Sequence, residues 1–380
     1  MRSTALTKRV CELVFAALLV CLGASSVLAE EVDVTVDAKT QVTSEEIQKT
    51  VTNAMQRETG WYPKLRIGGS AALNYNDGVA DVTDGTAFTV GALLKAGIDG
   101  VYKNLEWQNT LDIEEQFSKT PTLDSFIKSA DKLDFNTMLL FRIPKVEWLG
   151  PFIRFHLQSP IFWTDYVSDK DLTIRYYQND TKIDGKSDDK LVQQDFEPDV
   201  AAANKLGPGK KALKAQESTR MASAFEPLTL TESAGLFMNP YTTTPLTFTF
   251  KVGVAGQHLV TQGGYVPFDD NADDAFYDVK LLENQNSVGI EGEADLHGVI
   301  TEIVNWSLKA YLYYPFVMSA DTELTGIDLI HTDLQAKISV KISSWASIDY
   351  SLTAKIQPFV KEGWQINNTL LFTVGYDIFK

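Results

Sequence analysis

The sequence predicts an all-β protein, a single antiparallel transmembrane β-barrel of about 12 strands preceded by a short N-terminal periplasmic helix. Three observations predict this fold. Apolar and polar residues alternate through most of the chain, short and long links follow one another, and the tryptophans lie near the ends of the alternating segments. Alternation with a period of two indicates β-strands, because successive side chains point to opposite faces.

The chain begins with the features of a secretory signal peptide. A positive start, an apolar run and a small-residue cleavage site follow one another, at Arg2, Lys8 and Arg9, Leu13–Leu22, and Val27–Ala29. We therefore expect residues 1–29 to be removed. The alternative is a lipoprotein anchored through Cys21. Because Cys11 and Cys21 both precede the cleavage site, the mature chain is expected to lack disulfides.

The polar composition of residues 30–60 predicts a solvated N-terminal arm in the periplasm. Ser44 can cap a short helix, and Glu45 and Glu46 suit its first turn, where acidic side chains complement the helix dipole. An alternative interpretation takes "EVDVTV" as a segment for energised transport. The chain is too short for a plug and a large transporter barrel, so we favour the solvated arm.

The alternating segments occupy residues 61–380, which we predict to be one barrel domain. Their apolar sets span 65–75, 88–98, 105–113, 135–143, 153–161, 228–236, 246–254, 288–296, 304–314, 334–342, 348–356 and 370–378. A tilted transmembrane strand needs roughly 9–11 residues, and these segments provide that length. The even number is the one that a barrel with both termini on one side of a membrane requires.

Charged side chains occupy the opposite face of these segments. In a soluble sandwich the apolar face would point inward, whereas in a membrane barrel it points to lipid and the charged face lines the lumen. Closure in a membrane removes strand edges and satisfies every backbone group, which favours the barrel over a soluble secreted β-protein. The lumen-lining candidates are Arg66, Lys95, Glu106, Asp112, Arg142, Arg154, Lys251, Lys337, Lys341 and Lys355.

The links between segments predict the orientation. Short links at 100–104, 144–150, 239–245, 298–302 and 343–345 alternate with longer ones at 76–85, 118–131, 164–226, 261–276 and 318–326. Outer-membrane barrels have short periplasmic turns and longer external loops, so both termini should lie in the periplasm. The short link near residues 361–363 departs from this trend. The long external loop 164–226 is open to two interpretations, a constriction of the pore or a flexible cap.

One block of the sequence carries a family resemblance. Its marks are Gly60-Trp61, Asp84-Gly85, Trp107-Gln108-Asn109, Thr120-Pro121 and Lys128-Ser129-Ala130-Asp131. With these motifs, the first third of the mature chain resembles a family of uncharacterised Gram-negative outer-membrane β-barrel proteins. The resemblance implies a barrel and implies no particular chemistry.

Composition excludes some classes of function. The formal net charge of −16 would repel nucleic acid, and no basic patch with interleaved aromatic residues appears. The four histidines have no metal-ligand spacing. The acidic stretch 269–274 lacks the calcium-loop pattern, so we interpret it as a solvated loop. We therefore expect neither a metal nor another cofactor, and no enzymatic activity.

The leading prediction is a porin-like passive channel for small solutes across the outer membrane. The alternatives are a closed barrel with a structural or surface-interaction role and, third, an outer-membrane enzyme. The expected partners are outer-membrane lipid, lipopolysaccharide and the barrel-assembly machinery. The sequence leaves the solute and the oligomeric state open.

Overall fold

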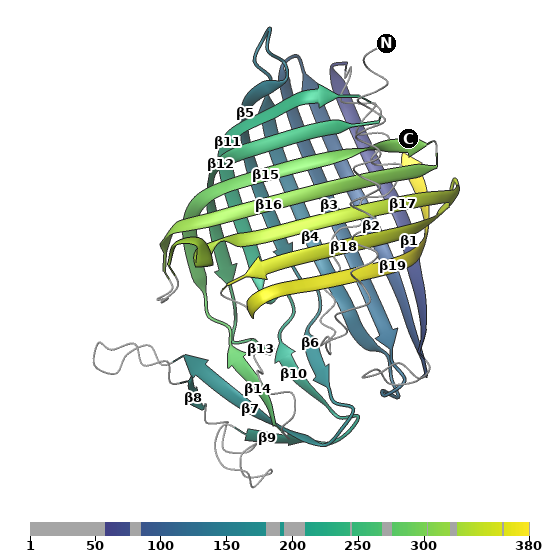
Figure 1. Cartoon of the computed structure of the whole chain (residues 1–380), viewed down its shortest axis with the longest axis vertical. Helices are drawn as coiled ribbons and strands as arrows, with labels where there is room; N and C mark the ends of the chain where they lie inside the picture. Colours follow the sequence, from purple (N-terminus) through teal and green to yellow (C-terminus); the bar gives the residue numbers. More distant parts are fainter. Residues whose placement is uncertain are drawn as a thin grey trace.

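The computed structural model describes residues 58–76, 85–179, 191–193, 210–243, 245–267, 276–301, 303–319, 325–358 and 361–379. Twelve of its strands close into one antiparallel barrel (Figure 1). The predicted fold class is therefore confirmed. The predicted signal peptide and N-terminal helix lie outside the described residues. Among the residues described, no helix is long and apolar enough to cross a membrane.

The barrel follows the chain order except where two insertions interrupt it. Its strands are β1 (Gly60–Asn76), β2 (Gly85–Tyr102), β3 (Leu105–Lys119), β4 (Ile127–Phe141), β5 (Leu149–Ser159), β11 (Leu228–Thr242), β12 (Thr247–Val260), β15 (Gln285–Thr301), β16 (Val304–Met318), β17 (His331–Ser343), β18 (Ala346–Gln357) and β19 (Lys361–Phe379). β5 pairs with β11, β12 pairs with β15, and β1 pairs with β19 to close the wall. The short 3₁₀ helix η1 (Gly326–Leu329) lies in the link before β17.

The links divide the barrel into two ends. At one end, which we call the turn end, β1 starts, β19 finishes and the short links join β2 to β3, β4 to β5, β11 to β12, β15 to β16 and β17 to β18. The longer links and both insertions lie at the opposite end, which we call the loop end.

The two faces of the wall have opposite character. Outward-facing side chains such as Ile67, Val254 and Leu370 are 51%, 53% and 62% exposed. Charged side chains at the alternate positions, such as Glu291 and Asp349, are buried. This is the reverse of a soluble protein, in which burying apolar surface drives folding. The apolar exterior therefore needs a lipid environment to be stable.

Tryptophans mark both edges of the apolar exterior. Trp61, Trp107, Trp148 and Trp345 are exposed at the turn end, whereas Trp163 and Trp364 are exposed at the loop end. Indole rings prefer the interface between lipid and water, where the ring is apolar and its N–H is hydrated. The two groups therefore delimit the height of the wall that meets lipid.

The two insertions fold together beyond the loop end into a unit that we call the loop-end domain. Its strands are β6 (Thr164–Val167), β7 (Leu172–Asn179), β8 (Leu191–Gln193), β9 (Lys210–Leu213), β10 (Ser218–Ala222), β13 (Tyr265–Pro267) and β14 (Phe276–Leu281). β6 pairs with β10, while β7 of the first insertion lies parallel to β14 of the second. A shared core of Leu172, Ile174, Tyr176, Leu213, Met221 and Val279 packs between them. The described part of the predicted loop 164–226 thus stands beyond the barrel as folded structure (Figure 1).

Buried hydrogen bonds hold this domain to the barrel rim. The Glu226 carboxylate is 1% exposed and accepts the backbone N–H groups of Gln262, Gly264 and Ser223, at 2.5, 2.6 and 2.9 Å. Gly263 takes a positive φ of 99°, which lets the chain turn around the carboxylate. Glu226 therefore joins the end of the first insertion to the start of the second.

Candidate functional site

The lumen is the candidate functional site, because the polar faces of all the barrel strands converge there. The structure places the ten predicted lumen residues on the inward-facing positions of β1–β5, β12, β17 and β18, or directly after β4. Five of them are buried: Arg66, Lys95, Glu106, Lys337 and Lys355. Burying a charge is energetically unfavourable unless it is paired, so the partners of these residues determine the electrostatic character of the lumen.

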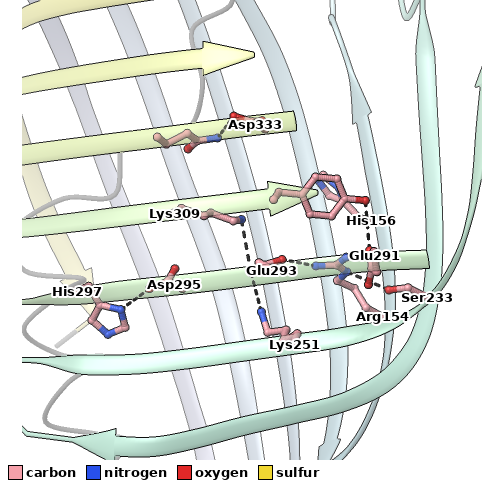
Figure 2. Close-up of polar contacts among 12 residues, drawn as sticks. Arg154, His156, Ser233, Lys251, Glu291, Glu293, Asp295, His297, Lys309 and Asp333 are labelled. Carbon is pink, nitrogen blue, oxygen red and sulfur yellow. Dashed lines mark hydrogen bonds and ion pairs between the residues drawn. The ribbon is translucent and has the colours of Figure 1, made fainter. Parts of the chain in front are cut away.

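The central feature is a network around Arg154 of β5 (Figure 2). Its guanidinium donates to Glu291 at 2.5 Å, to Glu293 at 2.7 Å and to the Ser233 hydroxyl at 3.2 Å. Glu291 also accepts a 3.3 Å hydrogen bond from the Tyr311 hydroxyl. A planar guanidinium suits such fork-like contacts to carboxylates, so the network fixes the position of β5 relative to β15.

Two lysines extend the network along the neighbouring wall. Lys251 donates to Glu293 at 2.9 Å, and Lys309 lies 3.7 Å from the same carboxylate. The Lys309 side chain is 42% exposed, whereas that of Glu293 is 6% exposed. Water therefore reaches Lys309 on the inside of the barrel, next to a carboxylate that is almost fully buried.

A second group of ion pairs lines β2, β3, β4 and β5. Arg142 pairs with Glu106 at 3.2 Å, and Lys95 lies 3.9 Å from Asp112. The Asp134 carboxylate lies 2.8 Å from the Lys132 ammonium and 3.0 Å from the Nε2 atom of His156. Acidic side chains on this wall are thus matched by cations from adjacent strands.

The wall formed by β17 and β18 is also polar. Asp349 accepts hydrogen bonds from the hydroxyls of Ser339 and Ser347, and Lys337 lies 4.0 Å from it.

Sequence reasoning missed one inward-facing feature, an apolar cluster near the turn end. Met138, Leu140, Phe152 and Phe237 form a buried cluster on β4, β5 and β11. The guanidinium of Arg142 lies 5.4 Å from the centre of the Phe237 ring. The signal was present in the sequence, because Phe152 and Phe237 occupy the polar parity of their strands and interrupt it. The cluster packs part of the lumen with apolar side chains.

The histidines occupy separate environments. His156 and His297 face the lumen beside Asp134 and Asp295, and His331 packs edge-on against Tyr313. His258 lies on the outer face with Asn286 and Glu232. Within the described ranges, no group of three or more His, Cys, Asp or Glu side chains could hold a metal ion.

An apolar exterior, a closed antiparallel wall and a charged interior together define a lipid-embedded barrel. The protein is a transmembrane β-barrel. Every strand of its wall is paired on both sides, so no backbone edge faces lipid. The chain therefore meets the strict requirement of the bilayer, that hydrogen bonds be satisfied internally.

No protein-family model and no curated protein matches the chain. Among solved structures, it is similar to the translocator domain of autotransporter NalP from Neisseria meningitidis, with 10% identity, coverage of 87% of this chain and 92% of that one, and a TM-score of 0.36. It is also similar to an outer membrane channel from Pseudomonas putida F1, with 9% identity, coverage of 85% of this chain and 97% of that one, and a TM-score of 0.36. The P. putida toluene transporter TodX is 9% identical, with coverage of 87% of this chain and 92% of that one, and a TM-score of 0.33. At these scores the fold assignment rests on the closed wall itself.

Proposed function

We propose that this barrel is a passive channel for small solutes across the outer membrane, with its loop end outside the cell. One observation carries the proposal: Lys309 is 42% exposed although it lies on the inward face of β16, beside the buried Glu293. A tightly filled barrel would desolvate this ammonium. Its exposure indicates a water-filled space within the wall, and such a space is the first requirement for passage.

The side chains of the lumen set the size and chemistry of the solute. Ion pairs such as Arg154 with Glu291, and the apolar cluster around Phe237, occupy part of the cross-section. A twelve-strand barrel lies between filled eight-strand barrels and the open barrels of porins with 16–18 strands. A narrow, charge-lined passage therefore favours small polar solutes over large ones.

The orientation rests on the asymmetry between the two ends. Short turns and both termini share one end, while the longer links and the loop-end domain share the other. Outer-membrane barrels place short turns in the periplasm and long loops outside.

Single-channel recording tests the proposal. The mature protein, residues 30–380, is refolded in detergent, and a change of gel mobility on boiling verifies that the barrel is folded. It is then added to a planar bilayer in salt solution. Stepwise conductance that a boiled sample lacks is the expected result. A folded barrel that inserts and stays electrically silent would contradict the proposal.

A surface-interaction role is the second candidate, and the loop-end domain favours it. That domain has its own core, including the fully buried Ile174 and Val279. An ordered external surface of this kind suits recognition of another molecule better than a mobile loop does. An electrically silent barrel whose loop-end domain resists proteolysis would support this second function.

A further inference from the structure

The charges of the central network do not balance within it. Glu291 and Glu293 carry two negative charges, and Arg154 and Lys251 already neutralise them through contacts of 2.5–2.9 Å. Lys309 is the surplus cation. Its ammonium lies 3.7 Å from Glu293, beyond hydrogen-bond distance, and its side chain is the most exposed of these five.

An acidic side chain next to Lys309, that of Asp295, also lies outside the central network. Asp295 of β15 is 32% exposed, and its carboxylate lies 2.6 Å from the Nδ1 atom of His297. A neutral imidazole donates a hydrogen bond but supplies no counter-charge. The Nε2 atom of His297 is buried and has no hydrogen-bond partner within the described part of the chain. Among the described residues, no lysine or arginine lies within 4 Å of the Asp295 carboxylate, and this side chain is open to the lumen.

The two surplus charges are direct neighbours. Asp295 and Lys309 oppose each other in the β15–β16 register, so their Cβ atoms are about 5 Å apart. Figure 2 shows the side chains turned apart, with Lys309 toward Glu293 and Asp295 toward His297. The pair therefore presents an ammonium and a carboxylate side by side, with both groups accessible from the lumen.

We propose that Lys309 and Asp295 form a binding site for a small zwitterionic solute, one that carries a carboxylate and an ammonium group. The solute carboxylate binds the Lys309 ammonium, and the solute ammonium binds the Asp295 carboxylate. A neutral or singly charged molecule of the same size meets one of these groups and leaves the other unmatched. This inference rests on the proposed channel function, because the solute reaches the site through the lumen.

Neighbouring residues suit a solute of this kind. Gln335 of β17 opposes Lys309 on its other side, and its amide donates to Asp333 at 3.2 Å. Ser307 opposes His297 in the β15–β16 register. The site therefore lies between a fixed ion network on one side and, on the other, an amide that is held by the Asp333 carboxylate. The Arg154 network holds Glu293 in place, so solute binding requires only that Lys309 swing away from it.

A set of three solutes with one carbon skeleton tests the proposal. Calorimetry on the detergent-refolded protein measures the affinities of 4-aminobutyrate, butyrate and butylammonium. The zwitterion should bind most tightly. Lys309→Gln and Asp295→Asn should each weaken 4-aminobutyrate binding about tenfold, the effect of losing one charge-assisted hydrogen bond. The control is Lys64→Gln, because Lys64 is 37% exposed but already bound to Asp99 at 2.8 Å.

A charge-exchanged variant separates binding from folding. In the double variant Lys309→Asp with Asp295→Lys, the two charges remain but trade places, so preference for the zwitterion should return. Equal affinity for the three solutes in the wild-type protein would overturn the proposal, as would a preference that survives both single substitutions. Zwitterion binding in a barrel that shows no conductance would keep the site and overturn the channel.

Discussion

The Nη2 atom of Arg154 lies 2.5 Å from the Oε2 atom of Glu291, although β11 and β12 stand between their strands in the wall. Three strand spacings correspond to about 14 Å along the sheet. The two side chains meet over the inner face of the intervening strands, where Arg154 also donates to Ser233 of β11. This contact joins parts of the chain that are separated by 137 residues and by both insertions.

Arg154→Gln should destabilise the barrel. The substitution leaves Glu291, which is 1% exposed, without its cation, and an uncompensated buried carboxylate is strongly unfavourable. We expect the free energy of unfolding in urea to fall by about 2–4 kcal/mol. The temperature at which the folded gel band disappears should fall as well.

The matched control for Arg154 is the exposed pair of Arg220 and Asp165. Arg220→Gln removes an ion pair whose side chains are 58% and 33% exposed, and such pairs contribute less than about 1 kcal/mol. Equal losses of stability in the two variants would argue against a special role for the Arg154 network.

Neutralising Arg142 should shift the ion selectivity of the channel toward cations. Its side chain is 24% exposed near the turn end of the lumen, where it pairs with Glu106. Removing the guanidinium leaves Glu106 as a net negative charge beside the passage. The measurement is the reversal potential of Arg142→Gln under a salt gradient.

The control for this selectivity change lies outside the lumen. Lys145→Gln alters an exposed lysine in the link between β4 and β5, and its reversal potential should match that of the wild-type protein. If Arg142→Gln also leaves the reversal potential unchanged, Arg142 does not line the conducting path.

Phe237→Ala should widen the passage and weaken the fold. The ring is 1% exposed in the cluster with Met138, Leu140 and Phe152. Removing it leaves a cavity, which costs about 3–5 kcal/mol of stability. The single-channel conductance should rise, because the vacated volume opens to the lumen.

An outward-facing phenylalanine provides the comparison for Phe237. Phe155 lies on β5 and is 37% exposed on the outer face, so Phe155→Ala should leave conductance unchanged. A Phe237→Ala barrel that is less stable but conducts like the wild-type protein would show that the cluster packs away from the conducting path.

Glu226→Ala should release the loop-end domain from the rim without opening the barrel. Three backbone N–H groups lose their acceptor, and each unsatisfied buried donor costs about 1–3 kcal/mol. Limited proteolysis should cleave the domain about tenfold faster or more, while the barrel band on a gel stays intact. The control is Glu217→Ala, an exposed carboxylate that accepts one backbone N–H.

The loop-end domain should lose stability in alkaline solution. Burial raises the pKa of Tyr176 above its ordinary value, and burial together with the nearby Tyr176 phenol raises the pKa of Tyr265. Above pH of about 10 the unfolded chain releases these phenol protons while the folded domain retains them. The domain therefore keeps its full stability below about pH 10 and loses it as the pH rises further.

Ultraviolet absorbance of the phenolate, recorded together with protease resistance, checks this pH dependence. Tyr176→Phe should reduce the alkaline loss, because the titrating group is removed while most of the packing stays. An alkaline loss of the same size in Tyr176→Phe would assign it to other groups.

Local pattern was enough to predict the barrel wall. Each of the predicted apolar sets overlaps one barrel strand, and the predicted lumen residues include Arg154 and Lys251 of the central network. A transmembrane strand alternates apolar residues that face lipid with polar residues that face the lumen, so every position in the strand contributes to the pattern. The tryptophans at the segment ends indicated how much of the wall lies within the membrane.

The partners of the lumen charges could not be read in the same way. Arg154 and Glu293 meet because the wall closes with a particular curvature, and strand periodicity carries no information about that distance. Phe152 and Phe237 were overlooked for a different reason. Each interrupts a polar row only once, and a single apolar residue has little weight in a periodic pattern.

The loop-end domain was beyond local prediction. Its strands are short, with three residues in β8 and three in β13, and they alternate too briefly to be recognised. Arg175 and Asp278, which join β7 to β14 through contacts of 2.5 and 2.6 Å, are 103 residues apart. Pairing over such a distance depends on the barrel that brings the two insertions together.

The parallel pairing of β7 with β14 has a consequence for biogenesis. Neither insertion contains both strands, so the domain cannot be completed until the second insertion has reached the same side of the membrane as the first. A completely folded loop-end domain therefore indicates that both insertions have been translocated across the membrane. A barrel stalled between the two insertions would display β7 as an open edge, ready to capture strands from other chains.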